Sequence, residues 1–197
     1  MIKRIFDISV SLIALILFLP FFVILAILIT IDSKGGIFYK QQRIGRNEQP
    51  FLMYKFRTMF TDADKKGLLT VGNHDNRITR MGYFLRKYKL DELPQLWNVL
   101  LGDMSLVGPR PEVKRYVDLY NTQQRQVFNI RPGLTDYASF DFINENELLA
   151  KSKNPEETYI QEILPKKLEL SLQYIREMSF FTDIKIILKT IKKIISG

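Results

Sequence analysis

The stretch from Ile8 to Ile31, ISVSLIALILFLPFFVILAILITI, constrains this chain most, because its 24 residues carry no charge. A helix needs about 20 mainly apolar residues to cross a bilayer, so the stretch is long enough for a membrane segment. Cations precede it, as in a signal peptide, but the run exceeds the usual ~7–15 apolar residues and no small-residue cleavage site follows. We therefore expect residues 1–33 to form a retained membrane anchor.

Pro20 lies at the middle of this stretch. A proline inside a helix removes one backbone hydrogen bond and clashes with the preceding turn, which costs about 3 kcal/mol or more. The anchor is therefore either a kinked span or a re-entrant hairpin that bends at Pro20. Cations favour the cytoplasmic side of a membrane, and a hairpin keeps both flanks there. The flanking cations, which favour the hairpin, are Lys3, Arg4, Lys34, Lys40, Arg43 and Arg46.

The charge balance of the chain points to an anionic partner. Lys and Arg number 29 against 21 Asp and Glu, for a net charge of +8, and such an excess suits phosphate, nucleic acid or a membrane surface. There is no cysteine and only one histidine, His74, which excludes disulfides, thiolate metal sites and histidine clusters. Chemistry must then rest on carboxylates, Lys, Arg and Tyr, or on a hard metal ion held by oxygen.

Residues 35–59 read as a β-hairpin whose turn is GRNE at residues 45–48. Lys55 and Arg57 are two residues apart on the second strand, so we expect them to share one face. That face either binds phosphate or is simply solvated. In the polar stretch that follows, Asp62 and Asp64 are either a metal-binding pair or part of a loop.

The segment YKLDELPQLWNVLLGDM places two adjacent acids, Asp91 and Glu92, before an apolar run. We expect a helix over residues 76–89 that carries Arg86 beside these acids, and a second over residues 92–101 with Asp91 as its N-cap. A helix N-terminus favours an ionised carboxylate, and a carboxylate beside a bound phosphate can act as a nucleophile. Ordinary helix capping is the alternative.

Two further arginines are braced by prolines. Arg110 lies between Pro109 and Pro111, and Arg131 precedes Pro132. A rigidly held arginine loses little freedom when it binds an oxyanion, so both are candidate phosphate ligands.

The C-terminal segment, residues 179–197, predicts a basic amphipathic helix. It either packs on the soluble core or lies in the lipid headgroup layer. Its apolar stripe comprises Ile184, Ile187, Leu188, Ile191 and Ile195, and its lysines are Lys185, Lys189, Lys192 and Lys193.

Three motifs, YKFRTM, LDELPQLWNVLLGDMSLVGPRPE and RPGLT, occur in the order and spacing of the bacterial sugar transferases. The chain thus resembles the monotopic phosphoglycosyl transferases, or polyprenyl-phosphate sugar-1-phosphate transferases, in their minimal form. The resemblance covers residues 3–135 and the basic C-terminal helix. It implies an α+β, mainly helical fold: a re-entrant membrane helix-hairpin, a small β-hairpin, and a compact helical catalytic domain over residues 34–178 with amphipathic interfacial helices.

The resemblance also implies the activity. Such enzymes move a sugar phosphate from a UDP-sugar to undecaprenyl phosphate in two steps and release UMP, at the cytoplasmic face of the bacterial inner membrane. Asp91 maps to the nucleophile and Glu92 to its partner; the two acids also map to the site of the required Mg²⁺. Lys55, Arg57 and Arg110 are our main candidates for neutralising the diphosphate, with Arg86 and Arg131 as further ones. Pro20 maps to the bend of the hairpin.

The sequence departs from the family pattern at two places. Leu19 precedes Pro20 where many members have serine. After RPGLT the chain lacks the usual tryptophan and Gly-rich stretch, so residues 136–162 either contact the sugar or form a solvated insert. The candidate sugar contacts there are Tyr137, Asp141, Asn144 and Glu145.

Other functions stay open at this point. A membrane-tethered basic module that recruits anionic lipids would explain the charge and both apolar segments, but not the proline-braced arginines beside an acidic pair. A glycosyltransferase that passes the sugar alone would release UDP rather than UMP. Nucleic acid is not an expected partner, because no recognised motif is present. A homodimer is compatible with the sequence.

Overall fold

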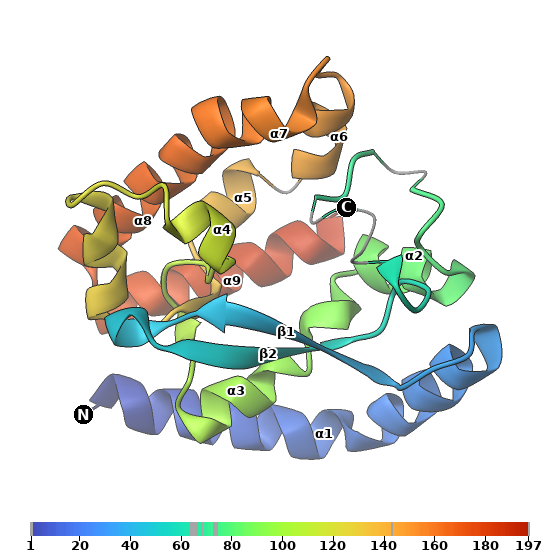
Figure 1. Ribbon diagram of the computed structural model, residues 1–197. Helices are drawn as coiled ribbons and strands as arrows, with labels where there is room; N and C mark the ends of the chain where they lie inside the picture. The colour runs from blue at the N-terminus through green and yellow to red at the C-terminus, as the bar shows by residue number, and fades with distance from the viewer. Residues whose placement is uncertain (1, 64–66, 68, 73–74, 143, 197) are drawn as a thin grey trace.

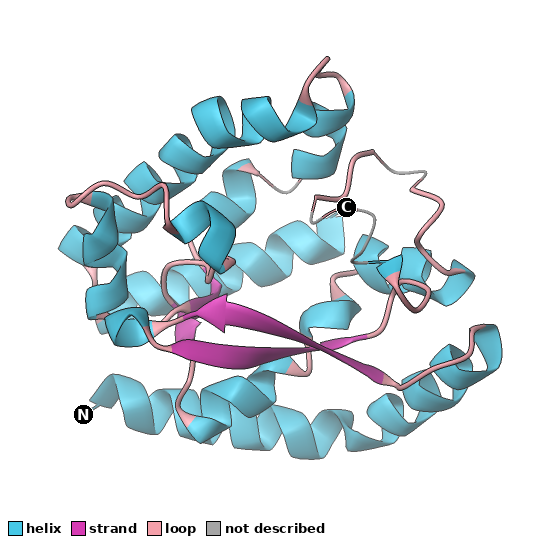
Figure 2. Cartoon of the chain, viewed as in Figure 1, coloured by secondary structure: helices cyan, strands magenta, loops and turns pink. Residues whose placement is uncertain are grey.

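The computed structural model describes residues 2–63, 67, 69–72, 75–142 and 144–196, so Asp64 and His74 lie outside it. The fold is mainly helical around a β-hairpin and a second, shorter pair of strands (Figures 1 and 2). The predicted α+β, mainly helical class is confirmed.

The predicted membrane anchor forms one long helix, α1 (Ile2–Asp32), with Pro20 inside it. Its length and apolar composition suffice to cross a membrane. Figure 1 shows α1 running along the base of the molecule and rising in its second half, and a proline within a helix is a usual cause of such a bend. Because the helix is uninterrupted, the predicted division into two antiparallel arms is not confirmed.

Both ends of α1 are fixed to the rest of the protein. Near the N-terminus, Lys3 pairs with Asp183 at 2.6 Å, and the buried Asp7 accepts a hydrogen bond from Ser105 Oγ at 2.8 Å. Near the C-terminus, Asp32 accepts a hydrogen bond from the backbone N–H of Met81 at 2.9 Å. The two parts of α1 on either side of Pro20 are therefore each tied to the rest of the protein.

The predicted β-hairpin is confirmed. Strands β1 (Phe38–Ile44) and β2 (Pro50–Phe56) pair antiparallel, with Phe38 opposite Phe56. A short 3-10 turn, η1 (Arg46–Glu48), joins them at the predicted place. Side chains alternate between the two faces of β2, and Met53 is buried on the face that packs against the core.

Helix α2 (Arg80–Lys87) and helix α3 (Gln95–Leu101) flank the segment that carries the two acids. Both are shorter than predicted. Thr79 caps α2, because its hydroxyl accepts a hydrogen bond from Gly82 N, and Gly102 ends α3 with a left-handed backbone at φ 102°. The buried Asn98 fixes α3 to β2: its Nδ2 donates to Leu52 O at 2.7 Å, and its Oδ1 accepts from Tyr54 N at 2.9 Å.

A short parallel pair, β3 (Ser105–Val107) and β4 (Gly133–Thr135), lies between α1 and the C-terminal helix. The backbone just beyond β3 approaches the start of β4 so closely that a Cβ on Gly133 would lie 2.1 Å from Gly108 N. Only glycine permits this contact, which brings the two proline-braced segments side by side.

The remaining helices cover the other side of the hairpin (Figure 1). We predicted residues 136–162 to be either sugar contacts or a solvated insert. The described part of this segment contains helices, and its residues Leu149 and Tyr159 are buried, so it is not simply a solvated insert. These elements are α4 (Lys114–Val117), η4 (Gln124–Asn129), α5 (Ala138–Asp141), α6 (Glu145–Ala150), α7 (Pro155–Thr158), η5 (Tyr159–Ile163), α8 (Leu164–Glu177) and α9 (Phe180–Ser196).

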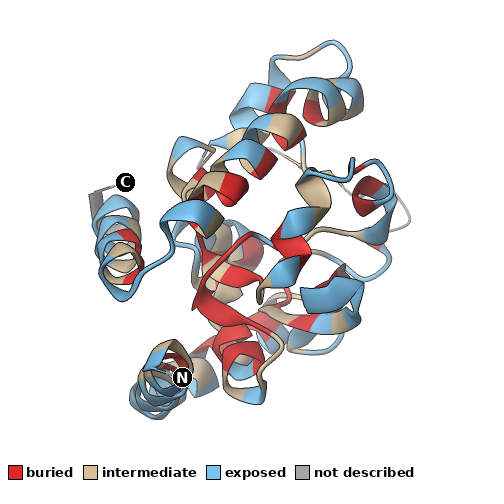
Figure 3. Ribbon diagram, turned by 90° about the vertical axis from the view of Figure 1, so that its left-hand side faces the viewer, coloured by how far each residue is buried: buried red, intermediate tan, exposed pale blue. Residues whose placement is uncertain are grey.

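The C-terminal helix α9 forms as predicted, but the face it buries differs from the predicted stripe. Ile186 is fully buried, and Thr190 Oγ1 is 2.7 Å from Thr135 Oγ1. Leu188 and Ile191 of the predicted stripe are exposed. Figure 3 shows α1 and α9 on the same side of the molecule, with much of their outer surface exposed.

Candidate active site

The two acids, Asp91 and Glu92, lie in a 3-10 turn, η3 (Leu90–Glu92), between α2 and α3. Lys89 precedes the turn with a left-handed backbone at φ 55°, which reverses the chain after α2. Asp91 makes no side-chain cap and α3 begins only at Gln95, so the predicted N-cap role of Asp91 is wrong. The turn nevertheless places both acids outside the regular helix, where neighbouring residues are not forced onto different faces.

Glu92 is held by two cations from separate elements. Lys55 Nζ, on β2, is 3.0 Å from Glu92 Oε1. Arg110, in the GPRP turn after β3, donates to both carboxylate oxygens, with Nη1 3.3 Å from Oε2 and Nη2 bonded to Oε1. Lys55 and Arg110, both predicted to neutralise the diphosphate, thus converge on Glu92; their predicted contact with the substrate stays a prediction.

Asp91 differs from Glu92 in its surroundings. Its residue surface is only 7% exposed, and no side chain within the described ranges donates a hydrogen bond to its carboxylate. Burial and the charge of Glu92 raise the pKa of Asp91, and Lys55 and Arg86 oppose that rise. Asp91 is therefore a buried carboxylate to which no described side chain donates a hydrogen bond.

The pKa shifts of Glu92 and of its two cationic partners show how Glu92 differs from Asp91. Burial alone would raise the pKa of Glu92, but Arg110 and Lys55 outweigh it and hold this pKa well below its usual value. Burial lowers the pKa of Lys55, and Glu92 opposes this. The ion pair with Glu92 raises the pKa of Arg110. Glu92 is thus firmly ionised and already neutralised by its partners.

Arg86 reaches the same region from α2. Its Nε donates to Thr58 Oγ1 at 2.9 Å and its Nη1 to Thr70 Oγ1 at 3.1 Å, which orients the guanidinium. Burial lowers the pKa of Arg86, and the carboxylate of Asp91 is the largest influence that opposes this. Arg86 is therefore an electrostatic neighbour of Asp91, in agreement with its predicted place.

Arg57 does not join the acids. The strand ends at Phe56, and the Arg57 guanidinium turns to the C-terminal end of α1. There it donates to Ile29 O at 3.2 Å, to Ser33 O at 2.7 Å and to Lys34 O. The prediction that Arg57 and Lys55 point to one shared face is wrong, because the carbonyls at the C-terminal end of a helix attract a cation and Arg57 turns to them.

Arg131 is also elsewhere. Its Nε donates to Gly102 O at 2.7 Å, at the end of α3. Arg4 lies in the same area and donates to Val99 O at 2.6 Å and Leu100 O at 3.0 Å. Arg131 therefore ties the segment before β4 to the C-terminal end of α3; its predicted role as a substrate ligand stays a prediction.

Mg²⁺ fits only one of the two acids as the site stands. No cluster of three or more acidic, histidine or cysteine side chains that could hold a metal ion occurs among the described residues. Mg²⁺ is often bound by one or two carboxylates together with substrate phosphates. Asp91 has a carboxylate available for this, whereas both oxygens of Glu92 are engaged by cations. The predicted metal role is thus compatible with Asp91 and requires Glu92 to release a cation.

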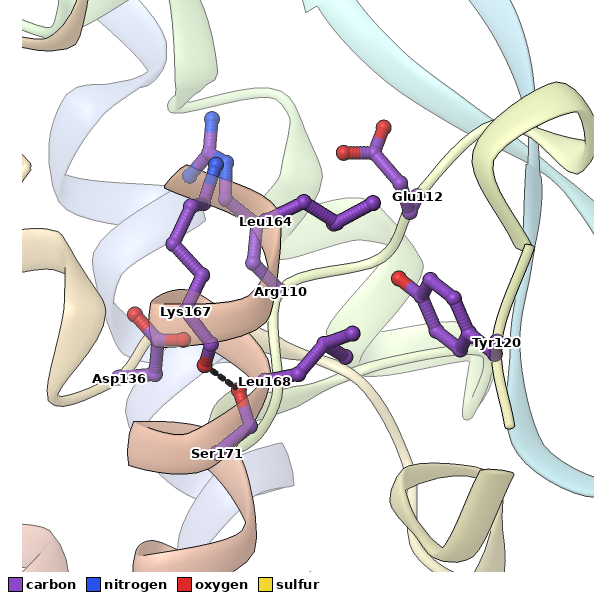
Figure 4. Close-up of a pocket in the computed structure, with 8 residues that line it drawn as sticks. All are labelled: Arg110, Glu112, Tyr120, Asp136, Leu164, Lys167, Leu168 and Ser171. Atoms are coloured by element: carbon purple, nitrogen blue, oxygen red, sulfur yellow. Dashed lines mark hydrogen bonds between the residues drawn. The ribbon is translucent and has the colours of Figure 1, made fainter. Parts of the chain in front are cut away.

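The sequence reading missed one buried acid near the site. Asp136 directly follows β4 and is 1% exposed. It shares a cavity wall with Arg110 and Lys167 (Figure 4). Its position immediately after the RPGLT motif was the only available signal, since a lone Asp in a polar stretch is ordinary.

Together these features define a class: a membrane-associated helical domain whose site sets a desolvated carboxylate among cations, as phosphate chemistry requires. The sequence model of the bacterial sugar transferase family matches residues 1–197, and the chain belongs to this family.

Three relatives illustrate the family. A UDP-N-acetylgalactosamine-undecaprenyl-phosphate N-acetylgalactosaminephosphotransferase of Aeromonas hydrophila is 35% identical and covers 100% of this chain, which spans 44% of that protein. The UDP-glucose:undecaprenyl-phosphate glucose-1-phosphate transferase of Escherichia coli is 34% identical. The match covers 98% of this chain and 40% of that protein. The uncharacterized sugar transferase EpsL of Bacillus subtilis is 35% identical, with 98% of this chain and 87% of that protein matched.

Proposed function

We propose that this protein transfers a sugar-1-phosphate from a UDP-sugar to undecaprenyl phosphate and releases UMP. The names of the Aeromonas and Escherichia relatives support the donor and acceptor classes. The single observation that carries the proposed chemistry is the contrast between the two acids: Glu92 is neutralised by Lys55 and Arg110, while Asp91 is buried without a hydrogen-bond donor among the described side chains.

In the first step, a carboxylate oxygen of Asp91 attacks the phosphorus that bears the sugar. The bond from that phosphorus to the oxygen of the uridine-bearing phosphate breaks, and UMP leaves with the electron pair. In the second step, an oxygen of the acceptor phosphate attacks the same phosphorus and displaces Asp91. The products are the lipid diphosphosugar and the regenerated carboxylate.

The cations around the acids reduce the repulsion between an anionic nucleophile and an anionic diphosphate. Lys55, Arg110 and Arg86 supply fixed positive charge, and Glu92 positions the first two through its ion pairs. Glu92 need not act as a base, because a phosphate monoester is already anionic near neutral pH. We assign Glu92 the role of a positioning residue.

We also propose that Mg²⁺ is required, with Asp91 as the protein residue best able to contact it. A bound Mg²⁺ would neutralise charge on the diphosphate. The chain's own contribution is to limit the rise in the pKa of Asp91: Lys55 and Arg86 oppose the effects of burial and of Glu92.

The anchor is proposed to enter the membrane and return on the same, cytoplasmic side. Support comes from the contacts at both ends of α1, since Lys3 and Asp32 bind parts of one domain. Ends held by one compact domain do not lie on opposite sides of a bilayer. Helix α9 lies on the same side of the molecule as α1 (Figure 3), and its residues Leu188 and Ile191 are exposed, which suits a second contact with the headgroup layer.

UMP release by purified protein tests the proposed chemistry. Wild-type protein with Mg²⁺ and a panel of UDP-sugars should release UMP only when the correct donor is present. Asp91→Asn keeps the size of the side chain but removes the nucleophile, and should lower turnover by at least ~10³-fold, the scale of losing a covalent catalyst. Release of UDP would instead indicate transfer of the sugar alone. Wild-type turnover in Asp91→Asn would refute the mechanism.

A further inference from the structure

A small cavity has Arg110 in its wall, next to the acids. It offers about 20 Å³ to the centres of water-sized molecules, which is enough for one such group and too little for a sugar ring. In Figure 4 the polar groups gather at one side and two leucines stand between them and Glu112 and Tyr120. The polar residues are Arg110, Asp136, Lys167 and Ser171, and the leucines are Leu164 and Leu168.

Asp136 lines this cavity and carries a buried acceptor without a partner among the described residues. Its Oδ1 accepts hydrogen bonds from Ser139 N at 2.9 Å and Ser139 Oγ at 2.7 Å, in the first turn of α5. Its Oδ2 is buried and has no hydrogen-bond partner among the described residues. A buried carboxylate oxygen without a donor is costly and rare, so this atom requires an explanation.

The neighbouring polar groups are already engaged within the chain. Lys167 Nζ is 2.8 Å from Glu145 Oε2, and Ser171 Oγ donates to Lys167 O at 2.9 Å. Neither side chain donates a hydrogen bond to Asp136. The open position in the cavity is therefore an acceptor, and a group that fills it must carry a hydrogen that it can donate.

Arg110 connects this acceptor to the chemistry. Its guanidinium binds Glu92, and its side chain lines the cavity together with Asp136. In the proposed reaction Asp91 attacks the phosphate to which the sugar is bonded. The sugar therefore lies next to that phosphate. A ring lying over Arg110 can extend one substituent toward the cavity.

We propose that Asp136 Oδ2 accepts a hydrogen bond from one hydroxyl of the donor's sugar and thereby sets which UDP-sugar the protein uses. This inference rests on the proposed function. The cavity is large enough for only a single hydroxyl or hydroxymethyl group. The negative charge of Asp136 favours a neutral hydrogen-bond donor over a phosphate or carboxylate.

Asp136→Asn is a suitable variant, because the amide keeps the Oδ1 acceptor for Ser139 while it replaces Oδ2 with a donor. We expect kcat/KM for the preferred UDP-sugar to fall about 10- to 100-fold, the range expected for a hydrogen bond to a charged group, with Tm unchanged. Ser139→Ala is the matched control: it removes one bond to Oδ1, and should lower Tm without changing the ranking of donors.

A set of UDP-sugar analogues, each lacking one hydroxyl, identifies the contact, with UMP release as the readout. Wild-type protein should lose activity by a similar factor toward one analogue, and Asp136→Asn should show no additional loss with that analogue. Equal losses for all analogues in Asp136→Asn, or a change in Tm with an unaltered donor ranking, would mean a structural role only and overturn the inference. Absence of UMP release by wild-type protein with every donor would overturn the proposed function, and this inference with it.

Discussion

Replacement of Arg57 by methionine separates two roles for this residue most clearly. In the structure its guanidinium binds three carbonyl oxygens at the end of α1, those of Ile29, Ser33 and Lys34. Methionine preserves much of the apolar stem but removes every one of these donors. We expect Arg57→Met to destabilise the fold by releasing the C-terminal end of the anchor helix.

The magnitude follows from those contacts. A hydrogen bond that involves a charged group contributes roughly 1.5–3 kcal/mol. Lys34 is exposed and Ser33 half-buried, so water can replace part of what Arg57 provides. The net loss should then be about 2–4 kcal/mol, and each kcal/mol lowers Tm by about 2–4 °C in a domain of this size. We expect Tm to fall by ~4–16 °C.

Thermal unfolding in detergent, measured alongside kcat/KM for UMP release below the new Tm, provides the assay. Arg80→Met is the matched control, because Arg80 is exposed at the first residue of α2, and its Tm should equal that of wild type. A variant Arg57→Met with wild-type Tm and much lower kcat/KM would refute the capping role and restore the sequence-based assignment to substrate binding.

Two further substitutions test the site and the packing. Glu92→Gln removes a negative neighbour that raises the pKa of Asp91, so the acid limb of kcat/KM against pH should move to lower pH in whatever activity remains; a shift to higher pH would contradict the assignment. Gly82→Ala would place a Cβ 2.0 Å from Thr58 O and should destabilise the protein by about 3 kcal/mol. Gly36→Ala, with its nearest contact at 3.6 Å, is the control, and equal Tm values for the two variants would refute this reasoning.

Local patterns in the sequence predicted the elements whose signals are local. The β-hairpin over β1 and β2 follows from alternation and a glycine-containing turn, and α9 follows from helical periodicity. The anchor was evident from its apolar run. Boundaries were less accurate: α3 starts later than predicted because Leu90–Glu92 form a separate 3-10 turn.

The contacts between distant segments were not predictable in the same way. Strands β3 and β4 have three residues each, too few for a periodic signal, and their pairing joins residues far apart in the chain. Lys55 and Arg57 look equivalent by spacing, but Lys55 turns to Glu92 and Arg57 to α1. Which carbonyl or carboxylate attracts a given cation depends on the tertiary arrangement, to which sequence periodicity is blind.

The double attachment of α1 has a geometric consequence for the acidic pair. Within the part of the chain that the structure describes, α1 is tied directly to the elements around Asp91: Arg4 binds the end of α3, and Asp32 binds the start of α2, the two helices on either side of η3. The distance between the two carboxylates and the apolar surface of α1 is consequently set by the packing of side chains within the fold.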